Sequence, residues 1–361
     1  MVVDGEHRRV VDWRDGRILD LVGCEHPIVQ APMAGAGGVD LCVAALEGGA
    51  LGSLPCAMLS PEQVHSQVLE VRSRAAGPVN LNFFCHTMPA QPDDGAWRTL
   101  LRPYYEEYGV DAGNGGALRL PFDAQMCGMV EELRSEVVSF HFGLPQPALL
   151  DRVKASGAVV IGNATTVEEA RWLEQRGVAA VIAQGFEAGG HTGRFLGSDP
   201  AEALGLFALL PQVVDAVNVP VIAAGGIADG RGIAAALVLG ASAVQLGTAY
   251  LHAPETPISD VHRRRLHEGR TLVTNLLTGG LARGVRGRLV EDLGPVRPEA
   301  PPYPLASAAL APIRAAAEKH GEFGFGPMWA GQAGPLGIRL PAADLTRKLA
   351  ADALAILRRE A

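Results

Sequence analysis

The residues most able to do chemistry lie in one glycine-rich stretch near the middle of the chain, which reads A-Q-G-F-E-A-G-G-H-T-G from Ala183 to Gly193. An apolar run, residues 179–183, leads into it and predicts a buried strand. Its histidine, His191, can donate or accept hydrogen bonds and titrates near neutral pH. The glycines let the backbone approach a ligand. We therefore expect a binding or catalytic loop, the alternative being a flexible turn with a solvated histidine.

Further candidate site residues lie at or near the carboxyl ends of the apolar runs. They are Met33, Asn82, His141, Asn163, Gln184, the pair Gly225-Gly226 and the pair Gly247-Thr248. The last two pairs follow the predicted seventh and eighth strands, where barrels of parallel strands commonly bind phosphate through backbone N–H groups. Both pairs together favour a phosphate site over two ordinary tight turns.

The motifs that the sequence lacks narrow the ligand. It has no Walker-type lysine and no G-x-G-x-x-G in its first unit, so a classical dinucleotide fold is not indicated. The phosphate then belongs to a mononucleotide such as a flavin, whose polar ring edge the amides of Asn82 and Gln184 could bind. His141 is either a substrate contact or a barrel histidine with a structural partner. No metal site is expected, because Glu187 and His191 have no evident third ligand.

Eight apolar runs, most of them followed by a helical pattern, must position these residues. They lie at residues 27–31, 50–54, 78–84, 137–143, 158–163, 179–183, 220–224 and 243–246. Such alternation predicts a parallel sheet, and eight units predict a closed (β/α)₈ TIM barrel rather than an open doubly wound sheet.

The same pattern divides the chain into a barrel and its additions. We expect a barrel over residues 1–252, with a long insertion at 86–122 after the third strand. Residues 186–205 are expected to form a loop. A C-terminal helical and loop extension, residues 253–361, is expected to pack on the barrel and cover one of its faces. The sequence does not decide which face it covers.

Composition excludes several classes of protein. The 361 residues carry 31 Lys and Arg against 39 Asp and Glu, and this net charge of −8 argues against a nucleic-acid partner. Five scattered cysteines without C-x-x-C spacing argue against disulfides or zinc. The polar N-terminus lacks a signal-peptide core, and no apolar run reaches membrane-spanning length. We expect a cytoplasmic protein with no membrane partner, either a monomer or a homodimer.

Several motifs together resemble the class I nitronate monooxygenases, formerly called 2-nitropropane dioxygenases, from about residue 17 to the end. They are P-I-V-Q-A-P-M-A-G, V-N-L-N-F-F, V-V-S-F-H-F-G, Q-G-F-E-A-G-G-H-T-G, P-V-I-A-A-G-G-I-A-D-G-R-G, V-Q-L-G-T and W-A-G-Q. The second half is also similar to FMN-dependent enoyl-acyl carrier protein reductases and to an NADH:quinone reductase subgroup. The early A-P-M-A-G and the late W-A-G-Q favour the monooxygenases.

This resemblance implies an FMN held noncovalently at the barrel mouth. The positions that match cofactor-binding residues are Met33, Asn82, Gln184, Gly189, Gly225, Gly226, Gln245, Gly247 and Thr248. His191 matches the catalytic histidine, which would orient a nitronate or deprotonate a nitroalkane. With O₂, the substrate would become a carbonyl compound and nitrite. The alternatives are an NAD(P)H-dependent FMN reductase of the enoyl-acyl carrier protein or quinone type, and a non-catalytic flavin-binding barrel.

Overall fold

The structure is a computed structural model that describes residues 13–90, 93–113, 118–197 and 200–359. The polar start of the chain at residues 1–12, and residues 114–117 of the predicted insertion, lie outside this described part. None of the helices found in the described ranges is long and apolar enough to cross a membrane.

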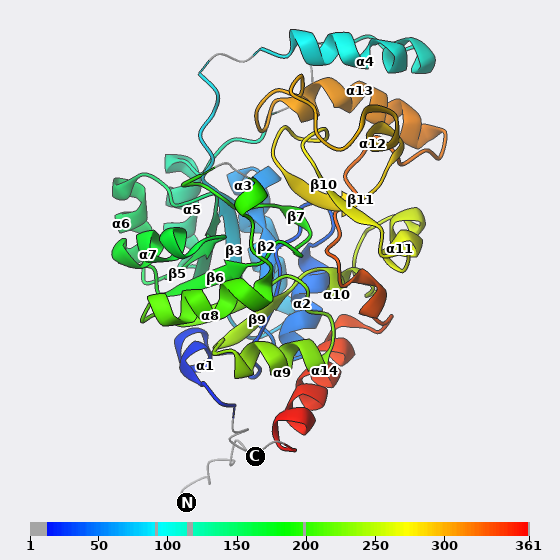
Figure 1. The fold of residues 1–361 in the computed structure, drawn as a ribbon. Helices are drawn as coiled ribbons and strands as arrows, with labels where there is room; N and C mark the ends of the chain where they lie inside the picture. Colours follow the sequence, from blue (N-terminus) through cyan, green and yellow to red (C-terminus); the bar gives the residue numbers. More distant parts are fainter. Residues whose placement is uncertain (1–12, 91–92, 114–117, 198–199, 360–361) are drawn as a thin grey trace, which may run out of the picture.

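Eight parallel strands form a nearly closed barrel with helices on its outside (Figure 1). They are β1 (Ile28–Gln30), β2 (Gly52–Pro55), β3 (Val79–Phe84), β4 (Val137–His141), β5 (Val159–Ala164), β6 (Ala180–Gln184), β8 (Val221–Ala224) and β9 (Ala243–Leu246). Their order is β1-β9-β8-β6-β5-β4-β3-β2, and a parallel bridge between Val29 and Leu51 joins the two end strands. The predicted (β/α)₈ barrel is confirmed.

Successive residues of each strand face two different cores, because side chains alternate across a sheet. In β6, Val181 packs in the layer that contains the helices, whereas Ala180 and Ile182 pack with Ile222 in a second cluster made mostly of strand residues. Ile18 of α1 (Arg17–Val22) joins this second cluster. The strands are therefore buried on both faces, which explains why they appear in the sequence as continuous apolar runs.

The helices of the barrel wall follow their strands in the expected rhythm. They are α2 (Val39–Glu47), α3 (Pro61–Arg74), α5 (Ala124–Leu133), α6 (Pro147–Ala155), α7 (Val167–Gln175), α8 (Leu206–Ala216) and α9 (Gly230–Val238). Local sequence starts several of them. At α3, the backbone N–H of Gln63 donates to the Ser60 hydroxyl, and the Gln63 side chain accepts from the Ser60 N–H. This capping box satisfies two groups that a helix start leaves unpaired.

The last helix of the wall comes from the end of the chain. After β9 only the short α10 (Thr248–Leu251) follows directly, and residues 252–341 leave the wall before the chain returns as α14 (Ala342–Leu357). This helix packs against both α9 and α2, so it lies between the two ends of the barrel repeat. The buried Tyr250 hydroxyl is hydrogen-bonded to Thr346 at 2.6 Å, which fixes α14 against the wall.

A second apolar cluster forms a cap from segments far apart in the sequence (Figure 1). It joins α4 (Gly95–Tyr108) of the insertion to α12 (Arg288–Leu293) and α13 (Ala306–Lys319), while α11 (Asp260–Leu266) lies beside it. The Trp97 indole donates to the Ala306 carbonyl at 3.2 Å, and the Tyr105 hydroxyl donates to the Ala309 carbonyl at 2.7 Å. The insertion and the C-terminal region thus pack together rather than separately.

A small antiparallel sheet connects this cap to the barrel. Its strands are β7 (Gly190–His191), β10 (Thr271–Thr274) and β11 (Ala282–Val285), in the order β10-β11-β7. The prediction of a loop over 186–205 is wrong for Gly190 and His191. A two-residue strand has no periodicity of its own, and it forms here only because β11 pairs with it from the C-terminal region.

Candidate active site

A pocket of about 300 Å³ opens at the carboxyl ends of the barrel strands, and residues of the cap form part of its wall. Every site residue expected from the sequence lines it: Met33, Asn82, His141, Gln184, Gly189, His191, Gly225, Gly226, Gln245, Gly247 and Thr248. The barrel topology brings these positions together, because the carboxyl ends of parallel strands meet on one face.

His191 is buried in this pocket and is held from two sides. Its backbone belongs to β7, where it pairs with Ala282 of β11. Its ring nitrogen Nε2 lies 2.9 Å from the hydroxyl of Thr278, which comes from the C-terminal region. The second ring nitrogen, Nδ1, has no such partner among the described residues, so it is available to a ligand.

Aromatic side chains surround the His191 ring. Phe84, Phe142, Tyr303 and Trp329 make edge-on contacts with it at centroid distances of 6.1, 5.9, 5.1 and 5.4 Å. Phe142 has a backbone φ of 64°, an uncommon left-handed conformation for a bulky residue. Such strain is often found at functional sites, and here it places the ring between those of His141 and His191.

Burial keeps His141 and His191, two of the three histidines that line the pocket, neutral at pH 7. It lowers the pKa of His191 well below its usual range, and the charge of Arg119 lowers it further. Burial also lowers the pKa of His141 to about 4, against a partial opposing effect from the His191 backbone. His191 is therefore a neutral hydrogen-bonding group and a weak base.

The amide of Gln184 is already occupied by protein groups. Its oxygen accepts from the Asn163 side chain at 3.0 Å and from the Gly193 N–H at 2.8 Å, and its nitrogen donates to the His191 carbonyl at 2.9 Å. Only one N–H of the amide is left for a ligand. Gln184 lines the pocket, but its main contacts hold the loop that carries His191.

Asn82 is partly occupied in the same way. Its nitrogen donates to the hydroxyl of Ser139 at 2.9 Å and to the Ser139 carbonyl at 3.3 Å. These bonds tie the amide of Asn82 on β3 to the neighbouring strand β4. The nitrogen is thus engaged by the strand, and no bond within the described residues engages the oxygen.

Two of the predicted cofactor residues also hold the W-A-G-Q segment in place. The Thr248 hydroxyl accepts from the Gly331 N–H at 2.8 Å. At Gly189, an added Cβ would lie 2.5 Å from the nitrogen of Gly331, so only glycine permits this approach. The W-A-G-Q motif therefore contributes to the site by closing one wall of the pocket, where Trp329 and Gly331 are exposed to it.

The remaining glycines and Gln245 leave room and an unpaired polar atom. Gly225 and Gly226 have φ values of 108° and 69°, which favour glycine and turn the backbone at the end of β8. Gly247 has only ordinary contacts around an added Cβ. The Gln245 side-chain oxygen is buried and has no hydrogen-bond partner among the described residues. A buried polar atom of this kind normally has a partner, and a bound ligand would supply one.

Glu187 is engaged away from the pocket. Both of its carboxylate oxygens accept from the Leu206 N–H, at 2.9 and 2.8 Å, and thus cap the start of α8. Across the described ranges, no group of three or more His, Cys, Asp and Glu side chains could hold a metal ion.

Several residues of the site were not found from the sequence. They are Phe84, Arg119, Phe142, Thr278 and Tyr303. Phe84 and Phe142 adjoin predicted strand ends and were open to prediction. Arg119, Thr278 and Tyr303 come from the insertion and the C-terminal region, where no strand periodicity indicates a position.

The fold and the pocket define a class of protein: a (β/α)₈-barrel enzyme whose site lies at the carboxyl ends of its strands. The model of the nitronate monooxygenase family matches residues 16–352. The chain therefore belongs to the nitronate monooxygenase family, a family of oxidoreductases that are generally flavin-dependent.

Individual relatives agree with this assignment. The chain is 41% identical to a nitronate monooxygenase of Paraburkholderia phytofirmans, over 92% of this chain and 93% of that one. It is 39% identical to a nitronate monooxygenase of Pseudomonas aeruginosa, over 92% and 97% of the two chains. The crystal structure of a nitroalkane oxidase from Streptomyces ansochromogenes has a TM-score of 0.87 and 36% identity, covering 96% of this chain and all of that one.

Proposed function

We propose that this protein oxidises alkyl nitronates with O₂, using bound FMN, and releases a carbonyl compound and nitrite. The observation that carries the proposal is the neutral, aromatic-enclosed His191 beside the cation Arg119 in the pocket of a nitronate monooxygenase fold. A nitronate is a planar anion that needs a positive charge and a hydrogen-bond donor more than it needs a base.

The backbone N–H groups and the unpaired polar atoms of the pocket support FMN as its ligand. The backbone turns at Gly225-Gly226 and Gly247 would receive the phosphate, and the unpaired oxygen of Gln245 would bond a donor on the flavin ring. Asn82 would offer its oxygen to the same ring. When bound, the flavin supplies the electron transfer, while the protein positions the reactants and excludes competing reactions.

The residues of this chain favour a nitronate over a neutral nitroalkane as substrate. A general base works best when its pKa lies near the working pH, and the pKa of His191 is lowered well below that range. In the proposed complex, His191 Nδ1–H donates to a nitronate oxygen, which requires the Thr278 hydroxyl to donate to Nε2. Arg119 supplies a compensating positive charge, and the rings of Phe142 and Trp329 limit the access of water.

The test combines cofactor release, flavin reduction and product analysis. Heating the purified protein should release FMN. Anaerobic mixing with ethylnitronate should bleach the flavin absorbance within the turnover time, and air should then yield one nitrite per nitronate consumed. Recovery of FAD, or rapid bleaching by NADH or NADPH but not by ethylnitronate, would contradict the proposal, and the second result would support the reductase alternative.

A further inference from the structure

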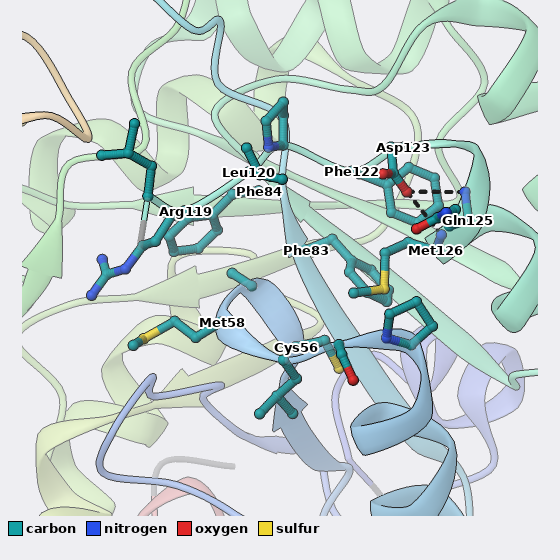
Figure 2. A pocket seen from close by; sticks show the side chains of 16 residues that line it. Cys56, Met58, Phe83, Phe84, Arg119, Leu120, Phe122, Asp123, Gln125 and Met126 are labelled. Atoms are coloured by element: carbon teal, nitrogen blue, oxygen red, sulfur yellow. Dashed lines mark hydrogen bonds between the residues drawn. The ribbon is translucent and has the colours of Figure 1, made fainter. Parts of the chain in front are cut away.

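A second cavity, of about 340 Å³, lies beside the active-site pocket (Figure 2). Its wall is formed by η1 (Cys56–Met58), residues 59–61, the end of β3, residues 118–123, Gln125 and Met126. Its volume lies within the range of natural small-molecule pockets, roughly 300–1,000 Å³. We call it the side cavity, and the function proposed above makes no use of it.

The side cavity adjoins the active-site pocket. Met58, Phe84 and Arg119 line both spaces, so these three residues form the neck between them. Figure 2 shows Arg119, Phe84 and Met58 on one side of the cavity, with Met126, Asp123 and Gln125 on the other. A ligand that passes between these side chains would therefore occupy both spaces.

The wall of the side cavity is mostly apolar. Its apolar members are Ala57, Met58, Leu59, Pro61, Phe83, Phe84, Leu118, Leu120, Pro121, Phe122 and Met126. Among its polar groups, Asp123 accepts from the N–H groups of Gln125 and Met126, and the Cys56 thiol donates to the Leu54 carbonyl, while the Gln125 side chain is exposed. Burial also raises the pKa of Cys56, so this thiol is not a nucleophile at neutral pH.

Arg119 gives the neck a positive charge. No carboxylate forms an ion pair with its guanidinium within the described residues. Its charge acts on groups in and beside the active-site pocket: it adds to the lowering of the pKa of His191 and His86 by burial, and it partly offsets the rise that burial causes in the pKa of Tyr303. Beside this cation the wall of the side cavity is mostly apolar, an arrangement that matches a ligand with an anionic head and an apolar tail.

We propose that the side cavity holds the alkyl tail of the substrate, and that this protein prefers unbranched long-chain nitronates to short ones. The inference rests on the proposed function, since it places the anionic nitronate beside His191 and Arg119. The tail then passes Phe84 and Met58 and lies against Phe83, Phe122 and Met126.

The first test is the dependence of kcat/KM on chain length. For the primary nitronates from ethylnitronate to octylnitronate, kcat/KM should rise roughly fourfold per methylene until the cavity is filled, as expected for the burial of a methylene group. A value that is flat or falls from ethylnitronate onward would overturn the inference while leaving nitronate oxidation intact.

The second test fills the cavity. Ala57 lines the side cavity but not the active-site pocket, so Ala57→Trp should remove the gain with chain length and leave kcat/KM for ethylnitronate unchanged. Ala124 is exposed, lies at the start of α5 and lines neither space, which makes Ala124→Trp a matched control with the wild-type profile. An equal loss for all chain lengths in Ala57→Trp, or the same profile in both variants, would contradict the inference.

A binding measurement separates the failure of the inference from the failure of the proposed function. Alkyl carboxylates are planar anions that resemble nitronates but do not react, and calorimetry on the purified protein should show octanoate binding more tightly than propionate. Ala57→Trp should abolish this difference. If the carboxylates behave so but no nitronate is oxidised, the cavity binds tails and the proposed function is wrong. If nitronates are oxidised and both carboxylates bind equally, the inference is wrong.

Discussion

The environment of His191 turns a common titratable side chain into a neutral one. A histidine in water is half protonated near pH 6.5, but here burial and the cation Arg119 both disfavour the charged form. Thr278 holds one ring nitrogen and leaves the other for a ligand. The residue is thus prepared for hydrogen bonding, and one of its ring nitrogens is held by a hydroxyl that lies 87 residues away in the chain.

Replacement of His191 by asparagine separates hydrogen bonding from proton transfer. His191→Asn should retain FMN, since the predicted cofactor contacts lie elsewhere. It should lower kcat/KM for neutral nitroethane by ~10²–10⁴-fold if His191 removes a proton. Because the pKa of His191 is lowered, we expect instead a similar loss with preformed ethylnitronate, which needs only the hydrogen bond. Steady-state kinetics at equal FMN occupancy measure both values.

The control for this variant is His141→Asn, which alters the neighbouring buried ring without touching the Thr278 contact. Wild-type activity of His191→Asn on both substrates would remove His191 from the reaction. A loss confined to His141→Asn would then assign its role to His141.

At the level of elements, residues in the loops at the strand ends can be needed for packing and backbone shape or for contact with a ligand, and the sequence does not distinguish these two roles. Gly189 and Thr248 are needed for the packing of the W-A-G-Q segment, whatever they contribute to a ligand. The left-handed backbone conformation at position 226 favours glycine there. Gly247 differs, because its φ of −104° is open to any residue and an added Cβ would meet Ala31 and Met33 only at 3.5 and 3.7 Å.

This contrast predicts opposite effects for two alanine variants. Gly247→Ala should leave the unfolding free energy of the FMN-free protein within ~0.5 kcal/mol of wild type. It should weaken FMN binding by about tenfold, or ~1.4 kcal/mol, because the added methyl group occupies the space at the end of β9. Gly226→Ala should instead lower that unfolding free energy by roughly 1 kcal/mol because of its φ of 69°. Urea unfolding without FMN and flavin titration measure the two effects. Unchanged FMN affinity in Gly247→Ala would exclude a cofactor contact there.

At the level of the whole molecule, the cap and the barrel bury an unusual set of neutral histidines. Six have pKa values lowered chiefly by burial: His26, His86, His141, His191, His252 and His262. The values for His141 and His262 fall to about 4. Three of them, His141, His191 and His262, line the pocket and His86 lies beside it, so loss of the cap would expose these four together.

These histidines predict a loss of stability in mild acid. Each folded-state pKa lies below the unfolded value near 6.5, so below pH 6.5 the unfolded chain binds more protons than the folded one. The unfolding free energy should therefore fall as pH drops from 6.5 to 4, by about 1.4 kcal/mol per pH unit for each proton bound in excess. Urea unfolding at pH 7.5, 6.0 and 5.0 measures this slope.

The carboxylates provide the comparison for this slope. The pKa of Asp15 is lowered to about 2, so its contribution to stability is lost only below about pH 4. The variant His141→Gln should make the loss between pH 6.5 and 5 shallower, because its glutamine takes up no proton in either state. A wild-type stability that is constant from pH 7.5 to 5.0 would show that the buried histidines are hydrated or paired in solution.

The sequence by itself determined the barrel and the composition of the strand ends. Apolar runs with helices between them specify parallel strands, and parallel strands carry their carboxyl ends to one face, so Asn82, His191 and Gly247 had to meet. Only the tertiary structure decided that Gln184 is engaged by Asn163 and Gly193. It also decided that α14 completes the barrel wall, and that Arg119 and Thr278 reach the site. The physical reason is that local propensity and periodicity act over a few residues, whereas these contacts join segments tens or hundreds of residues apart.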